Sequence, residues 1–341
     1  MKYRFLGHTG LRVSELCLGC MTFGTGFYGI GQVDQAGADR LVGRAIEGGI
    51  NFFDTADVYS RGESETILAQ SLTNVGASRA SVVIATKVRG PMSDGAATGK
   101  GDLNNVGLSR KHIFESCDAS LARLGTDYID LYQVHGWDQM TPLDETMRAL
   151  DDLVRQGKVR YIGCSNYAAW QVAKANGIAA AFDGARFVSH QAFYTMISRD
   201  LEEEIIPMCL SEGLGVMVWS PLAGGFLTGK FRRDAENPEN SRRSGFDFPP
   251  IDKELGYDVV ERLDELAAEK GATVAQLAIA WLLQQKGIAT VIIGAKKMGQ
   301  LEDNLGAVDV SFSVAELQEI HQVTRLSPRY PHWMIERMRR L

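Results

Sequence analysis

Residues 81–88 form the run Ser81-Val82-Val83-Ile84-Ala85-Thr86-Lys87-Val88, which is largely apolar but contains one lysine. A short run rich in valine and isoleucine is typical of a buried β-strand. An ammonium group inside such a strand is unfavourable unless an acidic group pairs with it. Lys87 is therefore a candidate for a functional site, because a buried lysine held by a carboxylate can tune a neighbouring acid.

Apolar runs of this kind recur along the chain and alternate with amphipathic stretches of helical period. The predicted strands are 16–22, 51–55, 81–88, 129–135, 159–165, 186–191, 215–220 and 289–294. The predicted helices are 34–48, 63–73, 109–124, 143–156, 167–176, 200–212, 258–284 and 299–306. Ser109 and Thr141-Pro142 provide helix-start signals, and glycines follow several predicted helices as C-terminal caps: Gly48-Gly49, Gly125, Gly157, Gly177 and Gly213.

Eight strand–helix units with short links predict an α/β fold, the closed (β/α)₈ barrel of parallel strands, preceded by a β-hairpin within residues 3–14. The competing fold is a doubly wound open sheet, which usually has a glycine-rich phosphate loop. Residues 24–29 match that glycine pattern, but residues 27–33 continue as a loop, so we interpret the match as accidental. No domain boundary is evident, and residues 1–341 are expected to form one barrel domain with a C-terminal tail over 324–341.

Two long polar loops, 89–108 and 228–256, each follow a predicted strand. In a barrel they would lie at the C-terminal face, where substrates bind. The tail, rich in aromatic and basic residues, has three interpretations: a cover over the barrel mouth, part of a subunit contact, or a solvated helix. A homo-oligomer therefore stays open as a prediction.

Composition excludes several classes of function. The chain of 341 residues has a formal net charge of −6, which gives no electrostatic support for nucleic-acid binding. We expect no membrane span and no secretion signal, and five scattered cysteines make a disulfide framework improbable, so a cytoplasmic location is the default. Cys17 and Cys20 form a CxxC pattern, but odd spacing within a strand directs the side chains to opposite faces, which favours packing over a redox or metal pair.

Four chemically active residues lie at or just beyond the ends of predicted strands. Asp54 ends the second strand with Tyr59 in the following loop, Lys87 ends the third and His135 ends the fourth. Each residue alone has a structural explanation, such as a turn cap or a satisfied core histidine. Polar residues at the C-terminal ends of barrel strands are typical of catalytic sites, so their joint placement predicts a shared site.

The charges of these four residues suggest their roles. A tyrosine hydroxyl has a pKa of about 10, and a nearby ammonium lowers that pKa by stabilising the phenolate. Lys87 would do this for Tyr59, Asp54 would hold Lys87 charged, and His135 would donate a hydrogen bond to a carbonyl oxygen. This arrangement suits carbonyl reduction, in which hydride reaches carbon while Tyr59 protonates oxygen. No metal site is expected.

The sequence resembles the aldo-keto reductase family over nearly its whole length. The matching segments are Asn51-Phe52-Phe53-Asp54-Thr55-Ala56-Asp57-Val58-Tyr59, Ala85-Thr86-Lys87, Asp130-Leu131-Tyr132-Gln133-Val134-His135, Gly163-Cys164-Ser165-Asn166, Trp219-Ser220-Pro221-Leu222, and Gly294-Ala295-Lys296 with Gln300 and Asn304. The resemblance implies a (β/α)₈ barrel that reduces aldehydes or ketones with NADPH. It implies Asp54, Tyr59, Lys87 and His135 as the catalytic set, with Tyr59 as general acid.

The resemblance also implies a cofactor site. It assigns Ser165, Asn166 and Gln191 to the nicotinamide carboxamide. Trp219 would stack on the nicotinamide ring, although a core tryptophan is an equally ordinary interpretation. Backbone groups in the segment from Ser220 onward would line the pyrophosphate, namely those of Leu222, Gly224 and Leu227, with Lys230 nearby.

At the adenosine end, Lys296 follows Gly294 and lies where many relatives carry a basic residue for the 2′-phosphate of NADP. Gln300 replaces an arginine found in some branches, and Asn304 would bind the adenine. We expect NADPH preference with NADH as an open alternative, because lysine provides a point charge and not a bidentate clamp. Met21, Tyr28 and Trp137 are predicted to shape a partly apolar substrate pocket.

Three functions remain as hypotheses. The first is an NADP(H)-dependent carbonyl reductase or alcohol dehydrogenase acting on a small molecule. The second is a cofactor-binding regulatory subunit with little turnover, since some proteins that resemble this family associate with ion channels. The third is an unrelated barrel enzyme such as an isomerase, which predicts no nicotinamide binding.

Overall fold

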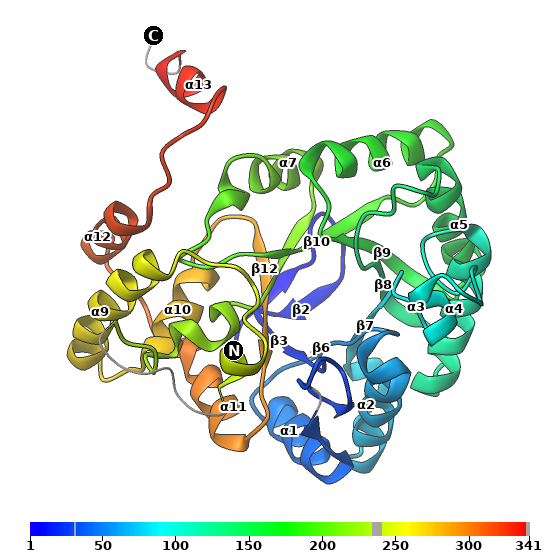
Figure 1. Cartoon of the computed structure of the whole chain (residues 1–341), viewed down its shortest axis with the longest axis horizontal. Helices are drawn as coiled ribbons and strands as arrows, with labels where there is room; N and C mark the ends of the chain where they lie inside the picture. Colours follow the sequence, from blue (N-terminus) through cyan, green and yellow to red (C-terminus); the bar gives the residue numbers. More distant parts are fainter. Residues whose placement is uncertain (31, 234–240, 339–341) are drawn as a thin grey trace.

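Eight short strands close into a barrel, and helices surround it (Figure 1). The computed structural model describes residues 1–30, 32–233 and 241–338. The barrel strands are β3 (Leu16–Gly19), β6 (Phe52–Asp54), β7 (Val83–Val88), β8 (Ile129–Val134), β9 (Val159–Ser165), β10 (Phe187–Phe193), β11 (Gly215–Trp219) and β12 (Ile288–Gly294). Every neighbouring pair is parallel, because the helix after each strand returns the chain to the same end. The predicted (β/α)₈ fold is confirmed.

Two antiparallel hairpins accompany the barrel. β1 (Tyr3–Phe5) pairs with β2 (Arg12–Ser14), as predicted, and Leu6 and Val13 pack against residues of the barrel interior. β4 (Gly24–Thr25) pairs with β5 (Gln32–Val33). This second hairpin contains the glycine pattern of residues 24–29, and the next helix begins only at Gln35, which agrees with the interpretation that the match is accidental.

The helices of the outer layer alternate with the barrel strands. They are α1 (Gln35–Glu47), α2 (Glu63–Asn74), α4 (Arg110–Leu124), α5 (Leu143–Arg155), α6 (Ala169–Ala181), α7 (Ile205–Glu212), α9 (Lys253–Lys270), α10 (Val274–Leu283), α11 (Met298–Leu305) and α12 (Val314–Thr324). Shorter helices are α3 (Asp94–Thr98), α8 (Arg242–Gly245) and α13 (His332–Met338), and the 3₁₀ turns are η1 (Tyr59–Gly62), η2 (Arg79–Ser81), η3 (Asp200–Glu202), η4 (Ala223–Thr228) and η5 (Gly306–Asp309). The Ser109 hydroxyl accepts a hydrogen bond from the His112 amide, so the predicted start of α4 is confirmed.

Some predicted helix boundaries were wrong. The stretch 258–284 is two helices, α9 and α10, which meet at a bend of 95°. Gly271 ends α9 with φ 62°, and the Thr273 side chain caps α10. Gly177 is not a cap, because α6 continues through the following alanines to Ala181. The loop predictions missed the short helices α3 and α8, and α12 was not predicted; residues 234–240 and 339–341 of the predicted loop and tail lie outside the described residues.

The hydrophobic core lies mainly between the strands and the helices, and a second apolar cluster fills the barrel interior. Cys17 belongs to the interior cluster and Cys20 to the outer one. Both cysteines are free and buried. Their separation supports the interpretation of this CxxC as two packing residues.

The C-terminal segment leaves α12 and leads outside the ring of helices to α13 (Figure 1). It therefore does not cover the barrel mouth. Tyr330 and Trp333 are exposed on this segment. Among the described residues, no single helix is long and apolar enough to cross a membrane, although the bent pair α9–α10 satisfies the criteria of length and composition.

Candidate active site

Lys87 lies at the end of β7 between two strands that also carry polar side chains into the barrel. Its side chain is completely buried. Register places Ala85 beside Asp54 of β6 and Lys87 beside Gln133 of β8. Because side chains alternate along a strand, these positions direct Asp54, Lys87 and Gln133 toward the same interior.

The Lys87 ammonium donates hydrogen bonds to three oxygens. They are Oδ1 of Asp54 at 2.5 Å, the carbonyl of Thr55 at 2.7 Å and the hydroxyl of Tyr59 at 3.3 Å. Burial opposes the charge on Lys87, but Asp54 and Tyr59 outweigh it and raise the pKa of Lys87 above its usual value. Lys87 is therefore a fixed positive charge next to the hydroxyl of Tyr59.

Asp54 is held by donors on both of its oxygens. Oδ2 accepts hydrogen bonds from the amides of Gln133 at 3.0 Å and Gln191 at 2.8 Å, while Oδ1 accepts from Lys87. A carboxylate with this set of donors keeps its position inside the barrel. Gln133 was not among the predicted site residues, although its place on β8 two residues before His135 is visible in the sequence.

Tyr59 begins the 3₁₀ turn η1, where Ser60, Arg61 and Gly62 all have positive φ. This tight turn brings the phenol back over Lys87, whose ammonium lies 4.8 Å from the ring centroid. Burial raises the pKa of Tyr59 more than Lys87 lowers it. Lys87 thus lowers this pKa as expected, but burial outweighs it, and the sequence does not reveal how completely water is excluded from the hydroxyl.

His135 follows β8 and lies beside Tyr59, with ring centroids 5.6 Å apart and planes at 78°. Burial, together with the positive charges of Lys87 and Arg89, holds the pKa of His135 well below its usual value. The imidazole is neutral near pH 7 and offers one N–H donor. The structure thus brings the four predicted catalytic residues together.

A chain of hydrogen bonds connects the residues predicted to bind the carboxamide. The Asn166 amide donates to the carbonyl of His135 at 3.0 Å and to the hydroxyl of Ser165 at 2.9 Å. The indole N–H of Trp219 donates to Asn166 Oδ1 at 3.1 Å, and Ser165 donates to the carbonyl of Gln191 at 2.9 Å. These side chains form one polar rim beside the proposed acid.

The segment after β11 is a compact turn with unusual backbone geometry. Ser220 has φ 52° and its hydroxyl accepts a hydrogen bond from the Gly224 amide. A Cβ atom on Gly224 would lie 2.7 Å from the carbonyl oxygen of Phe248, and its φ of 66° also favours glycine. Leu222 is half-buried, Leu227 is fully buried and Lys230 is exposed. Of these three residues, Lys230 alone presents a charged side chain to solvent.

Positive side chains gather near the last strand of the barrel. Lys296 is half-buried and donates to Gln32 at 3.0 Å. Burial and the nearby charge of Arg242 lower the pKa of Lys296. Arg242 also lies near Tyr59, which raises the pKa of Arg242, although burial lowers that pKa more. The buried Nε of Arg242 has no hydrogen-bond partner among the described residues. Arg242 was missed by sequence analysis, where the pair Arg242-Arg243 in a long loop was the available signal.

The remaining predicted cofactor residues lie around the start of α11. Gly294 ends β12 and is exposed. The Gln300 carbonyl accepts from the amides of Lys296 and Lys297 and so caps the helix, leaving its NH₂ group as the available donor. Asn304 is buried in α11.

Aromatic rings extend from Tyr59 across the face of the barrel. Phe27 contacts both Tyr59 and Tyr28, and Tyr28 stacks on Phe246 at 5.4 Å. Phe248 contacts Phe246 and stacks on Trp219 at 5.9 Å. Of the three predicted pocket residues, Tyr28 belongs to this arc; Met21 is half-buried, and Trp137 is half-buried next to Tyr167 and Trp170. Phe246 and Phe248 were not predicted, because their loop carries no regular pattern.

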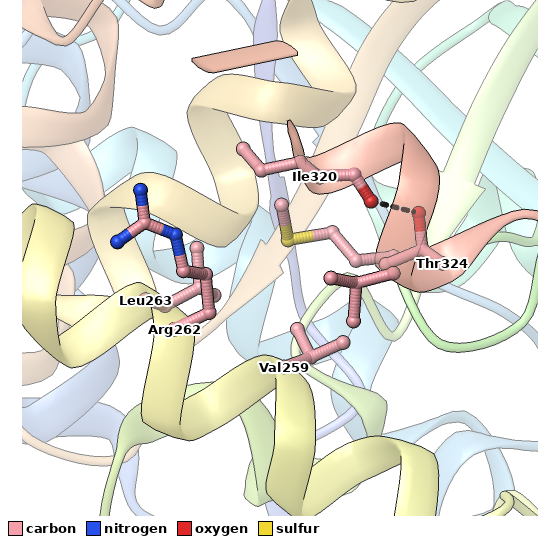
Figure 2. A pocket seen from close by; sticks show the side chains of 7 residues that line it. Val259, Arg262, Leu263, Ile320 and Thr324 are labelled. Carbon is pink, nitrogen blue, oxygen red and sulfur yellow. Dashed lines mark hydrogen bonds between the residues drawn. The ribbon is translucent and has the colours of Figure 1, made fainter. Parts of the chain in front are cut away.

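A separate hollow lies in the outer layer between α9 and α12. Figure 2 shows its apolar side chains and the hydrogen bond from the Thr324 hydroxyl to the carbonyl of Ile320. Its volume of about 10 Å³ is about that of one water probe. This hollow carries no group suited to catalysis.

Comparisons with known proteins agree with the fold and the site. The model of the "Aldo/keto reductase family" matches residues 15–325. Versiconal hemiacetal acetate reductase of Aspergillus parasiticus is 37% identical over 334 residues, covering 94% of this chain and 96% of that protein. The uncharacterized oxidoreductase YrpG of Bacillus subtilis is 38% identical, with coverage of 95% and 96%. A probable voltage-gated potassium channel subunit beta of Arabidopsis thaliana is 37% identical, with coverage of 97% and 99%.

Polar side chains gathered at the C-terminal ends of the strands of a parallel barrel are typical of an enzyme active site, and relatives named as a reductase and an oxidoreductase indicate that the class is oxidoreductase. The chain belongs to the aldo-keto reductase family.

Proposed function

We propose that the protein transfers hydride between NADP(H) and an aldehyde or ketone, with Tyr59 as the general acid in reduction and the general base in alcohol oxidation. The observation that carries the proposal is the contact of the Tyr59 hydroxyl with the Lys87 ammonium at 3.3 Å, while Lys87 also donates to Asp54 and to the carbonyl of Thr55. The hydroxyl keeps its proton available for a substrate oxygen.

The residues of the barrel face fit a dinucleotide. Gly224 keeps the turn after β11 compact, because its φ of 66° favours glycine and the carbonyl oxygen of Phe248 would lie 2.7 Å from a Cβ there. Arg242 has an unpartnered buried Nε, and it lies near Lys296, so two cations face a common region. Ser165, Asn166 and Gln191 would hold the carboxamide, Lys296 the 2′-phosphate, and Arg242 a phosphate group. When bound, the cofactor supplies the hydride.

The chain's own residues supply the proton and the orientation. The neutral His135 can donate a hydrogen bond to the substrate oxygen without competing as a second acid. Tyr59 then donates its proton to the same oxygen as negative charge develops, and Lys87 stabilises the resulting phenolate. Asp54 keeps Lys87 in place, and the amides of Gln133 and Gln191 keep Asp54 in place.

The first test is a fluorescence titration of the purified chain with NADPH and NADH, followed by NADPH oxidation in the presence of a carbonyl panel. We expect tighter binding of NADPH and turnover with part of the panel. Binding of neither nucleotide would contradict the proposed cofactor site as a whole.

A second candidate is a cofactor-binding regulatory subunit. It is favoured by the relatives from Arabidopsis thaliana and Schizosaccharomyces pombe whose names describe voltage-gated potassium channel subunits beta, at 37% and 36% identity. The same titration separates the two functions. Tight NADPH binding with negligible reduction over the whole panel would support the regulatory function and contradict the reductase.

A further inference from the structure

Arg89 presents a positive charge at the barrel face immediately beside the proposed active site. It follows Val88 at the end of β7, and His135 follows Val134 at the end of β8, where the two strands are paired. The His135 amide donates to the carbonyl of Val88 at 2.9 Å. Arg89 and His135 therefore leave neighbouring strands at the same level, and the charge of Arg89 contributes to the low pKa of His135.

The conformation of Arg89 is held by its surroundings. Its φ is 143°, in a region that favours glycine, and its carbonyl accepts a hydrogen bond from Gly107. The side chain runs along Gly136, and Nε donates to the carbonyl of Trp137 at 3.0 Å. The fold thus keeps Arg89 in an unfavourable backbone conformation, and this conformation holds its guanidinium beside His135.

The guanidinium keeps unused donors. Within residues 1–30, 32–233 and 241–338, the bond to Trp137 is the one hydrogen bond that the Arg89 side chain makes. Asp138 is near enough for Arg89 to lower its pKa, yet its carboxylate accepts from the amides of Leu108 and Met140 and from the hydroxyl of Thr141. The exposed terminal nitrogens of Arg89 remain as a planar fork, the geometry that binds an oxyanion through two parallel hydrogen bonds.

We propose that Arg89 binds an oxyanion on the substrate, so that the protein prefers aldehydes or ketones that carry a carboxylate or a phosphate over neutral carbonyls of the same size. The preference rests on the proposed reductase function, whereas the anion site itself can be tested without turnover. The aromatic surface of Trp137, whose carbonyl holds Arg89, would border the same substrate.

The test compares matched pairs of carbonyls in the presence of NADPH: para-carboxybenzaldehyde with its methyl ester, and glyceraldehyde 3-phosphate with glyceraldehyde. We expect the wild type to favour the anionic member of at least one pair by about tenfold or more in kcat/KM, and the favoured pair identifies the oxyanion as carboxylate or phosphate. Arg89→Gln should raise KM for the anionic member by about 10–100-fold and leave the neutral member within about threefold. Arg12→Gln, which alters an exposed arginine on the hairpin β1–β2, is the control and should change neither.

Two results would overturn the anion site: no anionic preference in the wild type, or an equal loss for anionic and neutral substrates in Arg89→Gln. Arg89→Gly separates binding from folding, because glycine tolerates φ 143°. It should retain or gain thermal stability while losing the anionic preference; a marked loss of stability would assign Arg89 a structural role instead.

Failure of the reductase is distinguishable from failure of the anion site. If no carbonyl is reduced, the proposed function fails, and calorimetric titration with benzoate and with inorganic phosphate decides the site alone. Binding of either anion at least about tenfold tighter to the wild type than to Arg89→Gln supports the site, and equal binding overturns it.

Discussion

Asp54→Asn removes the carboxylate that balances a buried lysine while keeping the size of the side chain. Asp54 is 3% exposed and Lys87 is 0% exposed, so water cannot replace the lost charge. Breaking a buried pair from one side costs about 3–5 kcal/mol, because the remaining charge is uncompensated. For a chain of 341 residues, an unfolding entropy of about 2.1 cal/mol/K per residue converts this loss to a decrease in Tm of about 4–7 °C.

The loss of stability should also depend on pH in a defined direction. In the wild type the pKa of Lys87 is raised, so the lysine is protonated in both folded and unfolded chains from pH 6 to 9 and contributes no slope there. Without Asp54, burial is the dominant effect and moves the pKa of Lys87 below its value in the unfolded chain. The folded variant then binds fewer protons than the unfolded one, and its stability rises with pH. The deficit of Asp54→Asn is therefore expected to be largest at pH 6 and smaller at pH 9.

The assay is urea unfolding, followed by tryptophan fluorescence at pH 6, 7, 8 and 9, supported by thermal melts. Adding Lys87→Met to Asp54→Asn should recover much of the loss, because the uncompensated charge is removed. Asp118→Asn is the matched control, since Asp118 pairs with Lys158 at 2.6 Å but is 56% exposed, and it should cost less than about 1 kcal/mol. An Asp54→Asn variant within about 1 kcal/mol of wild type at pH 7, with no slope in pH, would refute this account of the buried pair.

Two further variants test other parts of the molecule. Lys296→Ala should weaken NADPH binding by about tenfold or more and NADH binding far less, measured by fluorescence titration; equal weakening would mean that Lys296 does not contact the 2′-phosphate. Asp57→Asn should increase stability at pH 8 more than at pH 5, measured by urea unfolding. Burial and the charge of Glu65 raise the pKa of Asp57, so the wild type loses stability as pH rises above the pKa of the unfolded carboxyl. A gain that is equal at both pH values would contradict the raised pKa of the buried Asp57.

The barrel was predictable because its signals are local. Each strand is a short apolar run with a glycine or a helix cap nearby, and the observed strands lie close to the predicted ranges. Strand ends also predicted which side chains would meet, since parallel strands place their C-terminal ends at one face. The contacts of Lys87 with Asp54 and Tyr59 follow directly from that rule.

The errors arose where tertiary structure outweighs local pattern. The break within 258–284 is an exception, because Gly271 and the capping residue Thr273 signal it locally and the prediction of one helix overlooked them. Gly177 does not end α6, because its backbone stays helical and the helix continues to Ala181. Arg242, Phe246 and Phe248 reach the site from an irregular loop, whose path depends on packing and not on periodicity. The raised pKa of Tyr59 depends on the depth of burial, which no residue pattern gives.

The most direct test of the central proposal compares wild type with Tyr59→Phe on a carbonyl that the wild type reduces, at saturating NADPH. The account predicts unchanged NADPH affinity and a loss of about 10²–10⁴-fold in kcat, because only the proton donor is removed. Reduction within a few-fold of wild type, with the same affinity for NADPH, would contradict the role of Tyr59 as the general acid.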